Sequence, residues 1–536
     1  MIRKIINARI VDGSGEAPFL GGVEIKDGRI NRVFRGPSRD RAEDVLDAQG
    51  MVLTPGFVDI HRHHDIAALL DPEFGSIELA QGITTAVCGN CGLAPFPNSD
   101  RTRAMQFRYI EPCLGKMPED TPIHLVSEFM DALEEKKLPI HVGVLVGAGA
   151  CASSVIGYEH RGFTSEERQQ AVMLVRDGME HGALGLSFGI MYEPECYLSR
   201  EDQVAMAREA GLAGGFVSCH IRGEGDSLVE SVKEIIGICE EASVPLNISH
   251  FKSTGLKNWN KAIFEAIDVI ESARARGVRV TCDAYPYNAG ATTAMSLIPP
   301  EVLEGRSTDY LATDEGISHL KRLIYQKIPG WDNMVESIGW DRVVIGGVNL
   351  AKNREYAGKS VQQISDALGM DPTEFFARLV AEEEGKVGIT IFSMSETDVE
   401  QVLKLPYSVV ISDSLYGGME HPHPRLYGSF PRFLRKFVVE DGVLSLEEAV
   451  RKMTFLPAKR VGLKDRGLIE PGYAADLNLF DLQSITDQAD FVNPKQLAEG
   501  IFLTLVEGKE AAANSRRLEG AYGKLLRKQG TEYEFE

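Results

Sequence analysis

The stretch Val58-Asp59-Ile60-His61-Arg62-His63 decides the fold, because a short apolar strand runs directly into two histidines. The same arrangement returns at Val217-Ser218-Cys219-His220 and at Asn247-Ile248-Ser249-His250. Near the end of the chain, Val410-Ile411-Ser412-Asp413 ends on a carboxylate instead. Strands that end repeatedly on chemically active side chains indicate parallel βα units, whose functional residues lie at the carboxyl ends of the strands.

The spacing of these strand ends along the chain fits one barrel. His61 and Cys91 are 30 residues apart, and so are His220 and His250. A barrel with eight βα units in about 250 residues uses roughly 30 residues for each unit. We therefore expect these four residues, together with Asp413, to lie on the same rim.

The middle of the chain, from residue 56 to 464, alternates short apolar strands with amphipathic helices. This alternation predicts a (β/α)8 TIM-like barrel of the α/β class, and a doubly wound parallel sheet is the alternative. Thr164 and Glu167 form a possible capping box before one of the helices. The candidate strands are Gly56–Ile60, Ile83–Val87, Val142–Val146, Ala183–Phe188, Phe216–Cys219, Pro245–Ser249, Arg279–Cys282 and Val409–Ser412.

Both ends of the chain are predicted to be rich in strands. Residues 23–33 alternate around Asp27-Gly28, a dipeptide typical of two-residue hairpin turns. Residues 475–480 and 501–505 have strand-like patterns near the other end. The predicted domains are a small β-sandwich of residues 1–55 together with 465–536, and a barrel of residues 56–464.

One interval within the barrel is too long for a single crossover between strands. It separates the candidate strands at 279–282 and 409–412, whereas the loops of βα units usually span only a few residues. Residues from about 288 to 349 are therefore predicted to form an inserted lid, with Val343-Val344-Ile345 as its clearest strand. Such a lid would close over the rim and exclude bulk water.

Composition restricts the classes of partner. The chain has 536 residues and a formal net charge of −21, from 57 basic and 78 acidic residues. A surface this negative repels nucleic acid and anionic membranes, so we expect a small-molecule substrate and neither of those partners. The apolar start of the chain turns polar too early for a signal peptide, which makes the cytoplasm the expected compartment. The oligomeric state stays open, a homo-oligomer included.

Cysteine usage points away from disulfide bonds. The chain contains 8 cysteines without regular spacing. In a chain of this length, that pattern predicts buried thiols, of which one or two could bind a metal.

The residues expected on the rim suit a metal ion. Thiolate sulfur and imidazole nitrogen are donors that zinc prefers, and a catalytic zinc site keeps one position open for water. Zinc lowers the pKa of such a water, and a nearby carboxylate such as Asp413 can carry its proton. In the extended segment His61-Arg62-His63, both imidazoles point to the same side, which offers a second metal position shared with Asp413.

Each of these residues also has a structural interpretation. A single histidine at a strand end is more often hydrogen-bonded than metal-bound, and Cys91 alone would be a buried thiol. Cys88 and Cys91 form a C-x-x-C pair, but no second pair follows at the spacing of a structural zinc site. The coincidence of five suitable side chains on one expected rim favours a catalytic metal centre.

These residues, in this order, resemble the amidohydrolase superfamily and, within it, the N-acyl-D-amino-acid deacylase (D-aminoacylase) family. The likeness spans nearly the whole chain, and Gly89-Asn90-Cys91-Gly92 is its most specific element. Many members of the superfamily carry a carboxylated lysine at the end of the fourth strand, but here that strand ends Gly185-Leu186-Ser187-Phe188. The other matching segments are Thr54–His63, Gln81–Thr85, His220–Asp226, Ile248–Lys252, Asp283–Tyr287, Ser412–Asp413, His423–Arg425 and Pro471–Leu477.

The resemblance implies one tight zinc site and a weaker second site, with Asp413 as the general acid and base. Arg62 and His64 stand where members of the family often have other residue types, which leaves the number of bound metals open. The implied tight site consists of Cys91, His220 and His250, and the implied weaker site of His61, His63 and Asp413.

By the same resemblance, the activity is hydrolysis of the amide bond of N-acyl amino acids, with D-amino acids preferred, to a free amino acid and a carboxylate. The carboxylate of such a substrate needs a cationic or hydroxyl partner. Arg222 would serve this purpose or would support its own loop through Glu224. The residues in the segments that the family uses for substrate binding are Lys252, Tyr192, Tyr285 and Arg425.

Two alternatives remain. The first is a cyclic-amide hydrolase of the dihydroorotase or hydantoinase kind, against which the missing lysine and the presence of Cys91 argue. The second is a non-catalytic metal-binding scaffold, which we would expect to have lost some of its ligands.

Overall fold

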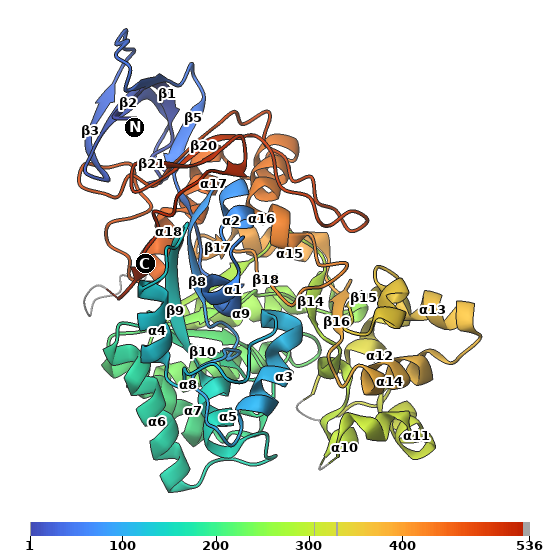
Figure 1. The fold of residues 1–536 in the computed structure, drawn as a ribbon. Helices are drawn as coiled ribbons and strands as arrows, with labels where there is room; N and C mark the ends of the chain where they lie inside the picture. The colour runs from blue at the N-terminus through green and yellow to red at the C-terminus, as the bar shows by residue number, and fades with distance from the viewer. Residues whose placement is uncertain (1, 305, 329–330, 529–536) are drawn as a thin grey trace.

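The structure is a computed structural model, and it describes residues 2–304, 306–328 and 331–528. The last part of the predicted terminal domain, residues 529–536, lies outside these described ranges. Figure 1 shows a barrel in the middle, a sheet built from both ends of the chain above it, and a third layer beside it.

The barrel sheet contains all the candidate strands, each within two residues of its predicted limits. Neighbouring strands follow the order β17-β13-β12-β11-β10-β9-β8-β6, and every described pair along this path is parallel. The TIM-like barrel is thereby confirmed. The strands are β6 (Phe57–Asp59), β8 (Ile83–Cys88), β9 (His141–Gly147), β10 (Gly185–Gly189), β11 (Val217–His220), β12 (Leu246–Ile248), β13 (Val280–Ala284) and β17 (Ser408–Val410).

The barrel closes between its first and last strands, which excludes the open, doubly wound alternative. The backbone N–H of Asp413 donates to the carbonyl of His61 at 2.9 Å. Just beyond, β18 (Ser414–Leu415) pairs in parallel with β7 (Arg62–His63). Closure therefore brings Asp413 beside both histidines of the opening stretch.

Helices surround the barrel, because each connection between parallel strands crosses its outer face. The predicted capping box is confirmed: the Thr164 hydroxyl accepts a hydrogen bond from the backbone N–H of Glu167 and starts α6. The helices are α1 (Asp65–Leu70), α2 (Ser76–Ala80), α3 (Arg103–Leu114), α4 (Val126–Glu134), α5 (Ala148–Ile156), α6 (Ser165–Glu180), α7 (Arg200–Leu212), α8 (Leu228–Ala242), α9 (Ala262–Ala275), α15 (Glu396–Lys404), α16 (Arg425–Phe433), α17 (Leu446–Met453) and α18 (Phe455–Arg460).

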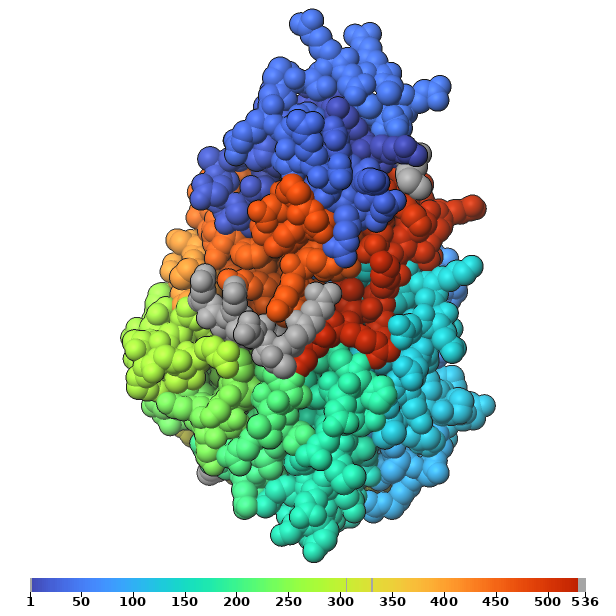
Figure 2. All heavy atoms as spheres, turned by 90° about the vertical axis from the view of Figure 1, so that its left-hand side faces the viewer, coloured from blue at the N-terminus to red at the C-terminus, as the bar shows by residue number. Residues whose placement is uncertain are grey.

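The second sheet combines strands from both ends of the chain. In Figure 2, the N-terminal part lies at the top of the molecule, and the C-terminal part lies below it, next to the barrel. The hairpin of this sheet turns at Asp27 and Gly28, where both φ angles are positive, as the predicted turn requires. A separate apolar core that includes Val23 and Leu503 lies against it. Its strands are β1 (Lys4–Ile10), β2 (Phe19–Lys26), β3 (Arg29–Arg35), β4 (Val45–Asp47), β5 (Val52–Pro55), β19 (Leu477–Phe480), β20 (Ile501–Val506), β21 (Lys509–Ala513) and β22 (Arg516–Arg517).

The third layer is inserted between β13 and β17, which nevertheless remain hydrogen-bonded neighbours in the barrel. It has its own sheet, in the order β14-β16-β15, and its own apolar core. This layer extends to Ile391, beyond the 288–349 stretch expected from the sequence, because β16 completes its sheet. Its elements are β14 (Gly290–Thr293), α10 (Pro300–Leu303), α11 (Asp314–Leu323), α12 (Met334–Ile338), β15 (Val343–Gly347), α13 (Val361–Leu368), α14 (Pro372–Glu382) and β16 (Gly388–Ile391).

Within the described ranges, no helix has both the length and the apolar character that crossing a bilayer requires.

Candidate active site

The side chains expected on one rim meet at the carboxyl ends of the barrel strands. His61 follows β6, His220 ends β11, and His250 follows β12. Cys91 lies in the loop after β8, and Asp413 lies after β17. All five are buried, and Asp413, the most accessible of them, is only 6% exposed.

One cluster joins Cys91, His220 and His250, whose possible ligand atoms all lie within 4.8 Å of one another. The Cys91 Sγ atom is 3.4 Å from Nε2 of His250. The rings of His220 and His250 have centroids 4.4 Å apart and meet edge to face. The residues implied for a tight metal site therefore converge.

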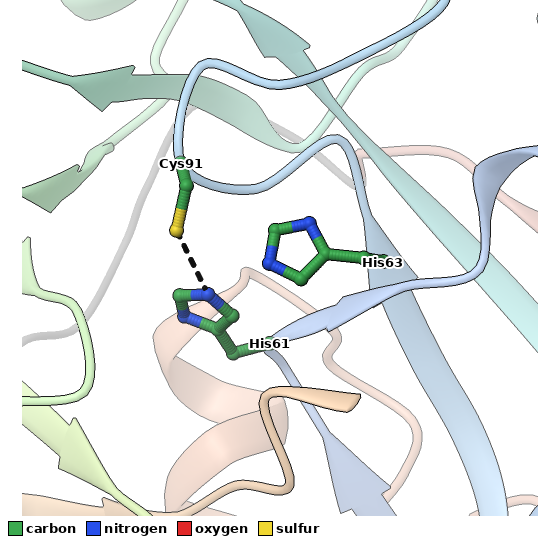
Figure 3. Close-up of side chains that lie close together, drawn as sticks. All are labelled: His61, His63 and Cys91. Carbon is green, nitrogen blue, oxygen red and sulfur yellow. Dashed lines mark hydrogen bonds between the residues drawn. The ribbon is translucent and has the colours of Figure 1, made fainter. Parts of the chain in front are cut away.

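A second cluster joins His61, His63 and Cys91, again within 4.8 Å (Figure 3). Nε2 of His61 is 3.2 Å from Cys91 Sγ. An oxygen of Asp413 lies 3.6 Å from Nε2 of His61 and 3.3 Å from Nε2 of His63. The two clusters share the sulfur of Cys91.

Left-handed backbone conformations aim three of these side chains at the centre. The φ angles are 55° at Cys91, 35° at His250 and 50° at Asp413. Non-glycine residues adopt this region at a cost, and such strain concentrates at functional sites. Gly189 makes room for the Cys91 loop, because a Cβ atom there would collide with the carbonyl of Cys91.

The protonation of the donors suits a metal ion. Burial lowers the pKa of His220 and of His250 well below the usual value, so both rings are neutral, the form that binds metals. Burial raises the pKa of the Cys91 thiol well above its usual value, so a thiolate at this position needs a cation beside it. Among the described residues, Nδ1 of His220 and Nδ1 of His63 are buried without a hydrogen-bond partner.

The distances between the sulfur and nitrogen atoms of these side chains also fit a bound zinc ion. Tetrahedral zinc, with bonds of about 2.3 Å to sulfur and about 2.0 Å to nitrogen, separates these donors by about 3.5 Å. The sulfur–nitrogen separations of 3.2 Å to His61 and 3.4 Å to His250 are close to this value. The residues present therefore fit a metal ion.

Asp413 is held in its ionised form. Burial favours its neutral form, but the charge of Arg425 and a hydrogen bond with His63 help to outweigh burial and lower its pKa well below the usual value. The nearest cation is Arg425, whose Nη1 lies 2.9 Å from a carboxylate oxygen. A carboxylate in this state can accept a proton from a water in the centre of the site.

A cavity of about 570 Å³ opens above the two clusters. Four of the residues expected to bind substrate line it, namely Lys252, Tyr192, Tyr285 and Arg425. Arg222 does not line this cavity, because its guanidinium group forms hydrogen bonds with Glu234 at 3.0–3.2 Å and with the carbonyl of Cys196.

Lys252 and Tyr285 lie next to each other on the cavity wall, with Nζ of Lys252 5.9 Å from the centre of the tyrosine ring. The Tyr285 hydroxyl is buried and has no hydrogen-bond partner among the described residues. Nζ of Lys252 donates to Glu224 at 2.6 Å. An ammonium and an unpaired hydroxyl at one wall can bind a carboxylate.

The structure adds three residues that sequence reasoning did not assign to the site. Glu224 lines the cavity and lies 3.1 Å from Nδ1 of His250. Asp283 lies 3.7 Å from Nδ1 of His61, and Met191 Sδ lies 3.2 Å from Nε2 of His220. Asp283 could have been predicted from the sequence, because it lies at the carboxyl end of a predicted strand, as the metal-competent residues do.

A third group of metal-competent residues lies at the opposite end of β9. It consists of His141, Asp476 and Glu507. Arg466 already pairs with both carboxylates, and the His141 ring is hydrogen-bonded to Asp476 and to the backbone N–H of Lys524. This group therefore joins the barrel to the terminal sheet.

A closed parallel barrel with a thiol, imidazoles and a carboxylate gathered over its carboxyl end defines a metal-dependent hydrolase. The sequence pattern of the amidohydrolase family matches residues 44–301 and 359–512. The chain belongs to this family.

Individual relatives point to one branch of the family. An N-acyl-D-aspartate deacylase from Alcaligenes xylosoxydans xylosoxydans is 31% identical over 94% of this chain and 91% of its own length. The N-acyl-D-glutamate deacylase of Bordetella bronchiseptica, solved with zinc and a phosphonate inhibitor, has a TM-score of 0.82 and 29% identity, covering 98% of this chain and 99% of that one. A D-aminoacylase structure, described with a binuclear metal centre, has a TM-score of 0.82 and 28% identity at the same coverage. The similarity to the N-acyl-D-amino-acid deacylases noted in the sequence is thereby confirmed.

Proposed function

We propose that this chain is a zinc-dependent deacylase, which hydrolyses the amide bond of N-acyl-D-amino acids to a free amino acid and a carboxylate. The observation that carries the proposal is the convergence of Cys91, His220 and His250 within 4.8 Å beneath a cavity that also contains Asp413 and Lys252. The preference for D-amino acids is supported by the names of the relatives, which are deacylases of N-acyl-D-aspartate and N-acyl-D-glutamate.

In this proposal, a zinc ion is held tightly by Cys91, His220 and His250. His61, His63 and Asp413 would hold a second metal ion more weakly. The bound metal supplies polarisation of the amide carbonyl and a lowered pKa for the attacking water.

The residues of the chain handle the protons. The ionised Asp413 accepts a proton from the attacking water and delivers it to the nitrogen of the departing amine. Arg425, 2.9 Å away, keeps this carboxylate ionised between turnovers. His61 and His63, whose Nε2 atoms lie within 3.6 Å of the carboxylate, fix its orientation.

The α-carboxylate of the substrate binds at the wall formed by Lys252 and Tyr285. The unpaired Tyr285 hydroxyl supports this assignment, because a buried hydroxyl without a partner is costly until a ligand satisfies it. Tyr192 and Arg425 line the same cavity, and we infer that they contact the rest of the substrate.

The alternatives have less support. In the fourth barrel strand, β10, no residue is a lysine, so the carboxylated lysine of many cyclic-amide hydrolases has no counterpart there. A non-catalytic scaffold has no need of an ionised aspartate beside an open cavity. The cytoplasmic location and a homo-oligomeric assembly stay predictions of the sequence.

A stereo-resolved hydrolysis screen with zinc analysis tests the proposal. We expect turnover of N-acetyl-D-amino acids, no comparable turnover of their L-enantiomers or of hydantoins, and bound zinc in the same sample. Cys91→Ser should lose zinc and activity together, whereas Cys88→Ser, a control at a buried thiol outside both clusters, should keep them. Hydantoin turnover without deacylation would favour the first alternative, and zinc-free protein would refute the metal assignment.

A further inference from the structure

We propose that the substrates of this site carry a neutral, apolar side chain, and that N-acyl derivatives of aspartate and glutamate are poor substrates. This inference rests on the proposed deacylase function and defines its substrate class. It is carried by the cations and the apolar residues that line the cavity.

Among the described residues that line the cavity, the lysines and arginines are Lys252 and Arg425. Each is already paired with a carboxylate, Lys252 with Glu224 at 2.6 Å and Arg425 with Asp413 at 2.9 Å. Nζ of Lys252 also lies 2.7 Å from Nδ1 of His250 and donates to the His250 carbonyl at 3.0 Å. The group without a partner at this wall is the Tyr285 hydroxyl, which can take the α-carboxylate of an N-acyl amino acid next to the charge of Lys252.

A second carboxylate would have no such partner. It would have to share Arg425 with Asp413, because a carboxylate oxygen of Asp413 already lies 2.9 Å from Nη1 of this guanidinium group. A buried carboxylate without a cation is strongly unfavourable. Substrates with an acidic side chain should therefore bind less tightly than substrates with a neutral one.

Much of the remaining cavity wall is apolar, and Thr254, Thr292 and Ser393 line it as well. The barrel contributes Leu93, Met191 and Leu415, and the inserted layer contributes Met334 and Ile391. Thioether and branched aliphatic side chains bury apolar groups and adapt to different shapes. They can accommodate side chains such as those of leucine or methionine.

The inference separates this chain from two of its relatives. The relatives at 31% and 29% identity are named for aspartate and for glutamate. Among the described lining residues of this cavity, the lysines and arginines are Lys252 and Arg425, and Arg425 is already paired with Asp413. The same catalytic rim would thus act on a different class of side chain.

Matched substrates test the inference. N-acetyl-D-leucine and N-acetyl-D-aspartate have branched side chains of similar size that differ mainly in charge. We expect kcat/KM to be at least about 100-fold higher for the leucine derivative than for the aspartate derivative. The N-acetyl-D-methionine derivative should likewise be preferred over the N-acetyl-D-glutamate derivative. Calorimetry should likewise show tighter binding of D-leucine than of D-aspartate as products.

A charge-introducing variant provides the reciprocal test. Thr292 is half-buried on β14, lines the cavity, and its hydroxyl lies 3.2 Å from that of Tyr192. Thr292→Lys should raise the ratio of aspartate to leucine turnover by about 10-fold or more, because it supplies the missing cation. Thr292→Met, which adds similar length without charge, should leave the ratio unchanged or lower it.

The outcomes are distinguishable. Efficient turnover of the aspartate derivative, within tenfold of leucine, or an unchanged ratio in folded, zinc-loaded Thr292→Lys would overturn the inference and leave the deacylase function intact. Absence of turnover for every N-acyl amino acid of either hand would refute the proposed function, and this inference with it.

Discussion

Replacing Arg62 by methionine should destabilise the barrel severely, because Arg62 holds the point where the barrel closes. Its side chain is fully buried, and Arg62 stands between His61 and His63 in the chain. The guanidinium group lies 3.1 Å from Asp59 and 2.9 Å from Glu78. It also donates to Ser412 Oγ at 3.0 Å, next to Asp413 in the chain.

The magnitude follows from the two carboxylates that Arg62→Met leaves behind. Removing one partner of a buried ion pair costs about 3–5 kcal/mol. Burial already raises the pKa of Asp59 despite its pairing with Arg62, so this carboxyl will take up a proton in the variant. Protonation limits the loss, and we expect a free energy of unfolding lower by about 3–5 kcal/mol in total.

Urea unfolding followed by far-UV circular dichroism measures this loss. Arg222→Met is the matched control, because it removes an arginine from a partly exposed pair with Glu234. Such a pair contributes at most about 1 kcal/mol. Equal losses in the two variants, or a loss below about 1 kcal/mol for Arg62→Met, would refute the reasoning.

Two further predictions concern single carboxyl groups. Asp413→Asn should lower kcat by about 10²–10⁴-fold, because it removes the proton acceptor. Elemental analysis should find zinc near the wild-type content, because Cys91, His220 and His250 are unchanged. Activity within tenfold of wild type would contradict the role of Asp413 as proton acceptor. Glu195→Gln should stabilise the protein at pH 8 but not at pH 4.5, because burial raises the pKa of Glu195 to about 8 from its usual 4.5. A raised folded-state pKa means that wild-type stability is complete below about pH 4.5 and is lost as the pH rises towards 8, by up to about 5 kcal/mol. Thermal unfolding at both pH values checks this, and a difference between the proteins that does not change with pH would contradict it.

The sequence by itself determined the barrel and most of the residues at its rim. Short apolar strands that end on His61, His220 and His250, together with the spacing of 30 residues, were sufficient, because strand periodicity and the direction of parallel strands are local properties. The hairpin at Asp27-Gly28 was equally local, since its turn requires residues that accept positive φ angles.

Only the tertiary structure decided how charged side chains pair across the site. Arg222 and Arg425 were both candidates for substrate binding, but Arg222 is held by Glu234 outside the cavity, whereas Arg425 pairs with Asp413 inside it. Glu224 proved to contact Lys252, 28 residues away, in a loop that no periodic pattern describes.

The limits of the inserted layer and its contribution to the cavity were also decided only by the tertiary structure. Its strand β15 was visible in the sequence, but the pairing that extends the layer to Ile391, and the cavity wall that the layer supplies, were not. Periodic patterns specify which face of an element is buried. Contacts between elements distant in the chain depend on how the faces pack together, and packing is fixed only when the whole chain has folded.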